Sequence, residues 1–159
     1  MSTLRAVRIW LVVFIVCLVL SGVTAFPLVA ELRLGATVLH ALPFGIPALT
    51  EWVDRVRDGL VATDGRYPFL AYGTDWLAFA HLVIAVAFLG PLRDPVRNIW
   101  VIQWGMIACV GVIPLAAIAG AVRGIPWGWT LIDMSFGVIG IIPLLIVYRL
   151  IRRLERERG

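Results

Sequence analysis

The sequence contains no lysine and few charged residues of any kind. Charged residues make up 15% of its 159 residues, while apolar residues make up 61% and the mean hydropathy is +0.95. A soluble domain of this length could not bury so much apolar surface, so the composition excludes an ordinary soluble protein. We expect the bilayer to be the solvent. The length suits a single membrane domain over residues 1–159, built as a bundle of a few spanning helices.

Cysteine and histidine are also scarce, with two of each. Cys17 and Cys109 lie inside apolar runs and form no CxxC motif, so we interpret them as small buried hydrophobes rather than a disulfide or redox pair. A haem held by two histidines would need both His40 and His81, and no attachment motif surrounds His40. The GxSxG, Walker and HExxH motifs of soluble enzymes are missing as well. We expect neither a metal nor a cofactor.

Charge is almost absent from four apolar runs, residues 9–30, 70–90, 98–122 and 127–148. Each run can cross a membrane as a helix, which predicts an all-α integral membrane four-helix bundle. The most apolar part of the second run, Trp76 to Leu89, covers only about 21 Å, so residues 69–73 must extend it. A cleaved signal peptide is the alternative for the first run, with small residues near Ala25, but the run continues past that site.

Arginine marks the ends of these runs. One set precedes the first run, joins the second to the third, and follows the fourth: Arg5, Arg8, Arg93, Arg97, Arg149, Arg152, Arg153, Arg156 and Arg158. The link between the third and fourth runs, on the opposite side of the membrane, contains only Arg123. The positive-inside rule therefore places both termini and the tail 149–159 in the cytoplasm and residues 31–69 outside. Because the net charge of +4 comes from helix ends, it predicts topology and not a nucleic-acid partner.

The outer segment contains an amphipathic pattern in PALTEWVDRVRDGLVATDG, residues 47–65. Its apolar residues recur at helical spacing and its charges occupy the other faces: Leu49, Trp52, Val53, Val56 and Leu60 against Glu51, Asp54, Arg55 and Asp58. Thr50 is the predicted N-cap. The preceding ALPFGIP, residues 41–47, reads as a turn-rich lead-in.

Two ionisable side chains lie inside the predicted spans. His81 lies about 12 Å below the outer surface and Asp133 about 9 Å below it, on helices that start on the same side. Intramembrane ionisable groups are costly and are candidates for function, so we predict that Asp133 orients His81 as a partner. Other polar residues are predicted near this pair, with Thr74, Asp75, Trp76 and Arg123 at the entrance and Glu31 and Asp58 at the mouth. Gln103 is predicted deeper, on the cytoplasmic side.

The same residues have a purely structural interpretation. A His–Asp pair can hold two helices together, since interhelical polar contacts contribute about 0.6–2 kcal/mol. Asp75 can compensate the dipole at a helix start, and Asp94 can form a local salt bridge between Arg93 and Arg97. A channel is disfavoured because one histidine and one aspartate do not make a charged pore, and no inverted repeat points to a transporter.

The layout of one helix, a long outer segment, three closely spaced helices and a basic tail resembles the EXPERA superfamily, which includes a sterol isomerase. Glu31 follows the first run, Asp58 lies in EWVDRVRDGLV, and His81 begins HLVIA at the place of a family acid or histidine. The resemblance implies a pocket for a lipophilic small molecule. The chain also resembles a group of small bacterial membrane proteins around residues 67–85, 90–108 and 131–144, a likeness that carries no assigned activity.

Two functions follow as hypotheses. In the first, His81 and Asp133 line an outer-half pocket that binds, and by acid–base chemistry isomerises, a lipophilic molecule. In the second, the chain is a non-catalytic structural or assembly protein acting through helix contacts at Gly105, Ala108, Gly111, Gly137 and Gly140. Membrane lipid is an expected partner in both, and a homodimer stays open.

Overall fold

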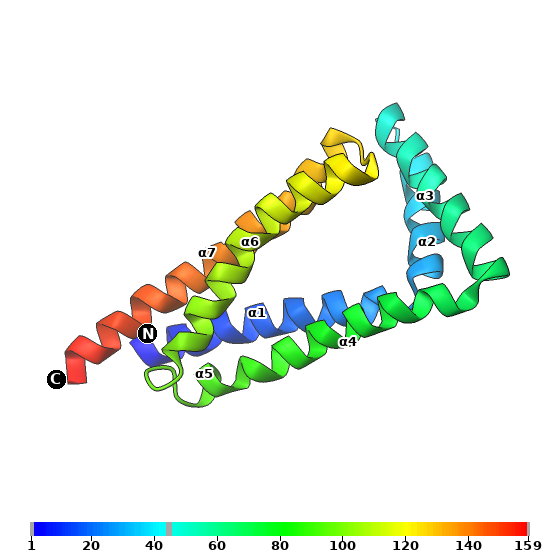
Figure 1. Ribbon diagram of the computed structural model, residues 1–159. Coiled ribbons are helices and arrows are strands. Elements are labelled where there is room, and N and C mark those ends of the chain that lie inside the picture. The colour runs from blue at the N-terminus through cyan, green and yellow to red at the C-terminus, as the bar shows by residue number, and fades with distance from the viewer. Residues whose placement is uncertain (1, 44–45, 159) are drawn as a thin grey trace. The chain divides into compact units, whose positions relative to one another are not determined.

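The computed structural model describes residues 2–43 and 46–158, and in these residues every regular element is a helix. The helices are α1 (Thr3–Ala25), α2 (Leu28–Ala41), α3 (Pro47–Arg66), the short 3-10 helix η1 (Pro68–Ala71), α4 (Tyr72–Ala87), α5 (Leu89–Arg93), α6 (Ile99–Arg123) and α7 (Trp127–Arg158) (Figure 1). Among the described residues, four stretches are long and apolar enough to cross a membrane, namely Thr3–Ala25, Pro68–Arg93, Ile99–Arg123 and Trp127–Glu157. The all-helical class and four candidate spans are therefore as predicted.

The chain divides into two compact units. Unit one comprises residues 1–18 and 83–159, and unit two comprises residues 19–82. The core of unit one is a cluster of fully or nearly fully buried side chains from α1, α6, α7 and the α4–α5 junction: Val7, Leu11, Phe88, Val101, Ile102, Leu144, Val147, Ile151 and Leu154. The four residues from α7 recur at helical spacing, so one face of that helix is committed to the core.

Glycine lets α6 and α7 approach closely in unit one. A Cβ on Gly137 would collide with the carbonyl oxygen of Cys109, and a Cβ on Gly140 would lie 3.1 Å from the Cys109 Sγ. A Cβ on Gly105 would lie 2.8 Å from Phe88 and 3.1 Å from Leu144. The prediction of close packing is therefore confirmed at Gly105, Gly137 and Gly140. At Gly111 it is wrong, because the structure describes no atom within 4 Å of such a Cβ.

The two cysteines differ from the sequence expectation in one respect. Both are free thiols, and Cys109 is partly buried beside the glycines of α7. Cys17 is exposed on α1, so its predicted burial within the protein is wrong. An apolar run in a membrane helix can face lipid on most sides, and hydropathy alone does not say which side faces protein.

The first helix begins and ends earlier than predicted. It starts at Thr3 rather than Ile9, and it stops at Ala25 rather than Ala30. Proline lacks a backbone N–H and disfavours a helical residue before it, so Pro27 ends the helix and takes the N-cap position of the next one. The following α2 was not predicted as a helix. It packs along α3.

The start of α3 also differs from the expectation. Its N-cap is Ile46, Pro47 occupies the first turn, and Thr50 lies inside the helix, where its hydroxyl donates a hydrogen bond to the Ile46 carbonyl over 3.3 Å. The predicted Thr50 cap is wrong because proline at the first helical position starts the helix one turn earlier. Val53 is buried, and the other apolar positions of the pattern are partly buried: Leu49, Trp52, Val56 and Leu60. The predicted turn at 41–47 includes residues 44–45, which lie outside the described residues.

The link between α5 and α6 and the C-terminal tail, both predicted to be cytoplasmic, are also defined. Asp94 accepts a hydrogen bond from the Arg97 backbone N–H over 3.2 Å and makes no ion pair within the described residues, so the predicted salt bridge is wrong. The Asn98 side chain donates to the carbonyls of Asp94 and Gly90, which closes the turn between α5 and α6. Beyond the fourth run, the chain stays helical to Arg158.

Candidate functional site

Unit two contains a pocket of about 550 Å³. Its lining comes from the α1–α2 turn, the first turns of α2, the end of α3, η1 and the start of α4: Phe26, Pro27, Leu28, Val29, Ala30, Arg33, Leu60, Thr63, Asp64, Tyr67, Leu70, Ala71, Thr74 and Asp75. This volume lies within the usual range of about 300–1,000 Å³ for small-molecule sites. All the lining residues belong to one unit, so the pocket is complete within it.

Local sequence signals explain why these segments meet. Leu60, Thr63, Asp64 and Tyr67 are three, four and seven residues apart, so they lie on one side of the end of α3. The Tyr67 N–H donates to the Thr63 carbonyl over 2.6 Å and ends that helix. Proline at the next position starts η1, which leads directly into α4. Two proline-marked turns, after α1 and after α3, therefore frame the pocket.

Three charged side chains contribute to an otherwise mainly apolar wall. They are Arg33 from α2, Asp64 from α3 and Asp75 from the first turn of α4. Within the described residues none of the three forms an ion pair. Asp75 is partly buried, and the neighbouring Thr74 is too. The pocket therefore offers two carboxylates and one guanidinium that are not engaged with other charged groups of the described structure.

The structure brings only two of the predicted site residues into this pocket, Thr74 and Asp75. Four others lie in unit two outside its lining, namely Glu31, Asp58, Trp76 and His81. Trp76 is exposed and meets the Tyr72 ring edge to face at 5.9 Å. Asp58 accepts hydrogen bonds from Arg57 at 2.8 and 2.9 Å, and Glu31 is exposed in the first turn of α2.

His81 lies on α4 in unit two and is partly buried. Its Nδ1 donates a hydrogen bond to the Leu77 carbonyl of the same helix over 2.9 Å, so one ring nitrogen is satisfied locally. Asp133 lies on α7 in unit one and is also partly buried. Their pairing would join the two units, and it stays a prediction.

The remaining predicted residues also belong to unit one. Arg123 is exposed in the last turn of α6, just before Gly124, which caps the helix with a φ of 66°. That left-handed conformation is readily available only to glycine. Gln103 is exposed near the start of α6 and lines a groove on that helix.

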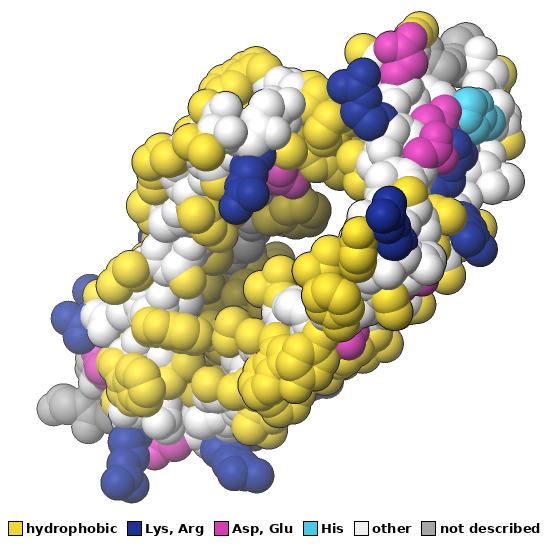
Figure 2. Space-filling model, turned by 45° about the vertical axis from the view of Figure 1, so that its right-hand side comes forward, with side chains coloured by type: hydrophobic (Ala, Val, Ile, Leu, Met, Phe, Trp, Pro, Cys, Tyr) yellow, Lys and Arg dark blue, Asp and Glu magenta, His cyan; other side chains and the backbone are white. Residues whose placement is uncertain are grey.

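Unit two also contains a polar cluster that sequence reasoning missed. The Nε2 atom of His40 on α2 lies 3.0 Å from an Asp54 carboxylate oxygen on α3, and Arg57 Nη1 donates to the other oxygen over 2.8 Å. Figure 2 shows acidic, basic and histidine side chains gathered over this pair of helices. The hydrogen bond from Arg57 to Asp58 raises the pKa of Arg57 above its ordinary value, so the guanidinium stays charged. The cluster ties the end of α2 to the first half of α3, whereas the pocket is lined by the start of α2 and the end of α3.

Arg33 and Asp64 were also missed as pocket residues. The signal for Asp64 was available, because it lies four residues after Leu60 on a predicted helix. No comparable signal existed for Arg33, since its place depends on the break at Pro27 and on α2. Within the described part of the chain, no group of three or more histidine, cysteine or acidic residues could hold a metal ion. Comparison of the chain with protein-family models, curated proteins and solved structures found no match.

Proposed function

We propose that this chain is a multi-pass membrane protein that binds a lipophilic small molecule with a cationic end in the pocket of unit two. The observation that carries the proposal is the partly buried Asp75, without an ion-pair partner in the described structure, in the wall of a largely apolar pocket of about 550 Å³. A few polar groups placed in an apolar cavity are typical of small-molecule sites.

The charge of the lining favours a cationic ligand. Asp64 and Asp75 contribute two negative charges and Arg33 contributes one positive charge, so the sum over the lining is −1. A carboxylate that is partly withdrawn from water gains from an opposite charge within about 4–6 Å. The aliphatic and aromatic walls, including Phe26, Leu28 and Leu70, suit the apolar body of such a ligand.

The test compares probes that share one alkyl chain and differ in charge. Dodecylamine, dodecanol and dodecanoate are titrated below their micellar concentrations into detergent-purified protein, and binding is followed by the change in melting temperature. We expect dodecylamine to bind tightest. We expect Asp75→Asn to weaken its binding by about fivefold, as the loss of one charge partner would.

A matched control separates a local effect from a change in overall charge. Glu51→Gln removes one negative charge from an exposed position of α3 outside the lining. Equal binding of the three probes by the wild type contradicts the proposal. So does a loss of dodecylamine binding in Glu51→Gln as large as that in Asp75→Asn.

The hypothesis of a site around His81 and Asp133 predicts a different result. In our proposal, His81→Ala and Asp133→Asn leave dodecylamine binding unchanged, because neither side chain lines the pocket. We propose binding and no isomerisation. An assembly protein acting through glycine contacts is less favoured, since Gly105, Gly137 and Gly140 are already packed within unit one.

We further propose a bacterial inner membrane location with both termini in the cytoplasm and the pocket on the outer side. Arginine is concentrated at the termini and in the link between α5 and α6, which supports this orientation. Fusion of a fluorescent reporter that folds only in the cytoplasm to the C-terminus tests it. A dark but full-length fusion contradicts the proposed orientation.

A further inference from the structure

A second hollow of about 600 Å³ lies on unit one, between α6 and α7. It is lined by Gln103, Met106, Ile107 and Val110 from α6 and by Ile141 and Tyr148 from α7. The walls are apolar apart from the Gln103 amide and the Tyr148 hydroxyl. A groove of this kind on a spanning helix pair would face acyl chains in a membrane.

The α7 side of the groove continues into a cationic surface. Ile141, Tyr148, Arg152, Glu155 and Arg156 are spaced by seven, four, three and one residues, which places them on one side of the helix. Arg152 lies about 6 Å and Arg156 about 12 Å beyond Tyr148 along the helix axis. Arg152, Glu155 and Arg156 line a shallow hollow of their own. An apolar groove and a basic hollow therefore follow one another along the same face.

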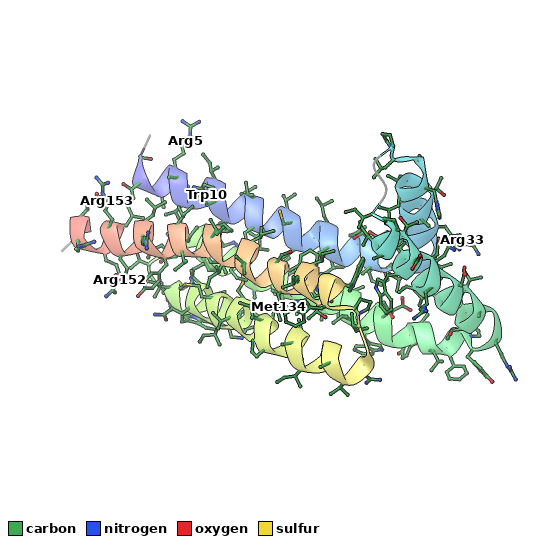
Figure 3. The ribbon with its side chains drawn as sticks, turned by 90° about the horizontal axis from the view of Figure 1, so that it is seen from above. Arg5, Trp10, Arg33, Met134, Arg152 and Arg153 are labelled. Carbon is green, nitrogen blue, oxygen red and sulfur yellow. The ribbon has the colours of Figure 1, made fainter. Side chains whose placement is uncertain are left out.

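The ion pairs of the tail leave positive charge on this face. Arg152 Nη1 donates to Glu155 over 2.7 Å, whereas the Arg156 Nε donates to the Arg152 carbonyl over 3.3 Å and pairs with no carboxylate in the described residues. Arg153 pairs with Glu157 over 2.8 Å, and Figure 3 shows Arg152 and Arg153 pointing to opposite sides of α7. The groove side of the tail thus carries two arginines and one glutamate.

The two polar groups of the groove lie at its basic end. Gly105 packs against Leu144, so Gln103 on α6 is at the level of the turn of α7 that ends near Tyr148. Tyrosine is enriched at the membrane–water interface, and both side chains can donate hydrogen bonds. They occupy the position where the ester groups of a lipid would lie if its chain filled the groove.

We propose that this face of α6 and α7 binds one anionic phospholipid. Its acyl chain lies in the groove from Val110 to Tyr148, its ester region meets Gln103 and Tyr148, and its phosphate meets Arg152 and Arg156. Guanidinium groups bind phosphate oxygens through charge-assisted and often bidentate hydrogen bonds. The site is independent of the pocket in unit two, because every residue that forms it belongs to unit one.

The test is native mass spectrometry of the purified full chain, titrated with phosphatidylglycerol or with phosphatidylcholine of the same acyl chains. We expect the wild type to bind the first phosphatidylglycerol about tenfold more tightly than phosphatidylcholine. The double variant Arg152→Gln/Arg156→Gln loses this preference. The matched control Arg5→Gln/Arg8→Gln removes the same charge from α1 and keeps it. If both double variants lose the preference for phosphatidylglycerol to the same extent, the proposal is overturned.

A second pair of variants tests the groove itself. Val110 is 55% exposed and Ile118 is 67% exposed, so a larger apolar side chain at either position leaves the core of α6 and α7 undisturbed. Val110→Phe fills the groove and weakens binding of both phospholipids, while Ile118→Phe, outside the groove, does not. Unchanged binding by a folded Val110→Phe variant, checked by its melting temperature, overturns the proposal.

Discussion

Gly22 of α1 lies directly against His81 of α4. A Cβ built on Gly22 would lie 3.1 Å from the His81 Cβ and 2.9 Å from the carbonyl oxygen of Ala78. This contact holds the Cβ of His81 against the backbone of α1. The Nδ1 of His81 donates a hydrogen bond to the Leu77 carbonyl. The histidine inside an apolar helix therefore has a packing role within unit two, whatever its other ring nitrogen does.

Gly22→Ala is expected to destabilise the protein by about 1–3 kcal/mol, because the added methyl group forces α1 and α4 apart. Thermal unfolding in detergent measures the effect. The control is Gly73→Ala at the start of α4, where the structure describes nothing within 4 Å of the new Cβ and alanine is the better helix former. Equal melting temperatures for wild type and Gly22→Ala would show that this helix contact is not tight.

Gly137→Ala is expected to disrupt the α6–α7 pair, because the new methyl group meets the Cys109 carbonyl oxygen, which belongs to the backbone and cannot rotate away. Overpacking of this kind typically costs about 1–3 kcal/mol. Gly111→Ala on α6 is the control, since its Cβ meets no described atom within 4 Å. The two variants are compared by thermal unfolding, and similar stabilities would contradict the close approach of the helices.

Trp52→Phe is expected to change the stability of the protein by less than about 1 kcal/mol. The Trp52 Nε1 is buried and has no hydrogen-bond partner in the described residues, so removing this donor offsets the loss of ring area. Trp52→Ala removes the ring as well and is expected to cost about 3 kcal/mol. If chemical denaturation shows equally large losses for both, the indole N–H has a partner that these residues do not supply.

Asp54→Asn is expected to loosen the α2–α3 pair, because the carboxylate accepts from both His40 and Arg57. Exposed ion pairs are weak, so amide exchange in α2 should accelerate by only about twofold to fivefold. Hydrogen exchange with mass spectrometry measures this by segment. In the control, Asp58→Asn, only the contact with Arg57 on the same helix is lost, and exchange in α2 should stay unchanged.

The presence of four candidate spans could be predicted because a long uncharged run has a simple preference for lipid over water, although the first span begins six residues earlier than predicted and the fourth ends nine residues later. The helix α2 could not. Glu31, Arg33 and His40 interrupt its apolar pattern, and it packs along α3, a neighbour that sequence spacing does not identify. The exposure of Cys17 could not be predicted either, because hydropathy does not distinguish a lipid-facing position from a buried one.

The pocket was predictable only in part for a related reason. Thr74 and Asp75 stand at the start of a span, where a polar pair is conspicuous. Their neighbours Arg33 and Asp64 come from helices separated from them by turns at Pro27 and Pro68, and the geometry of those turns decides which side chains meet. Asp58 was predicted to line the mouth of the site, but its carboxylate forms a salt bridge with Arg57 instead.

The uninterrupted length of α7 has a mechanical consequence. Its 32 residues make a rod of about 48 Å, well beyond the ~30 Å of a bilayer's hydrocarbon layer. The arginine-rich end is continuous with the candidate span Trp127–Glu157, so in a membrane it would extend beyond the hydrocarbon layer as a helical arm. A small change in the tilt of the span would then displace that end across the membrane surface by several times the displacement within the bilayer.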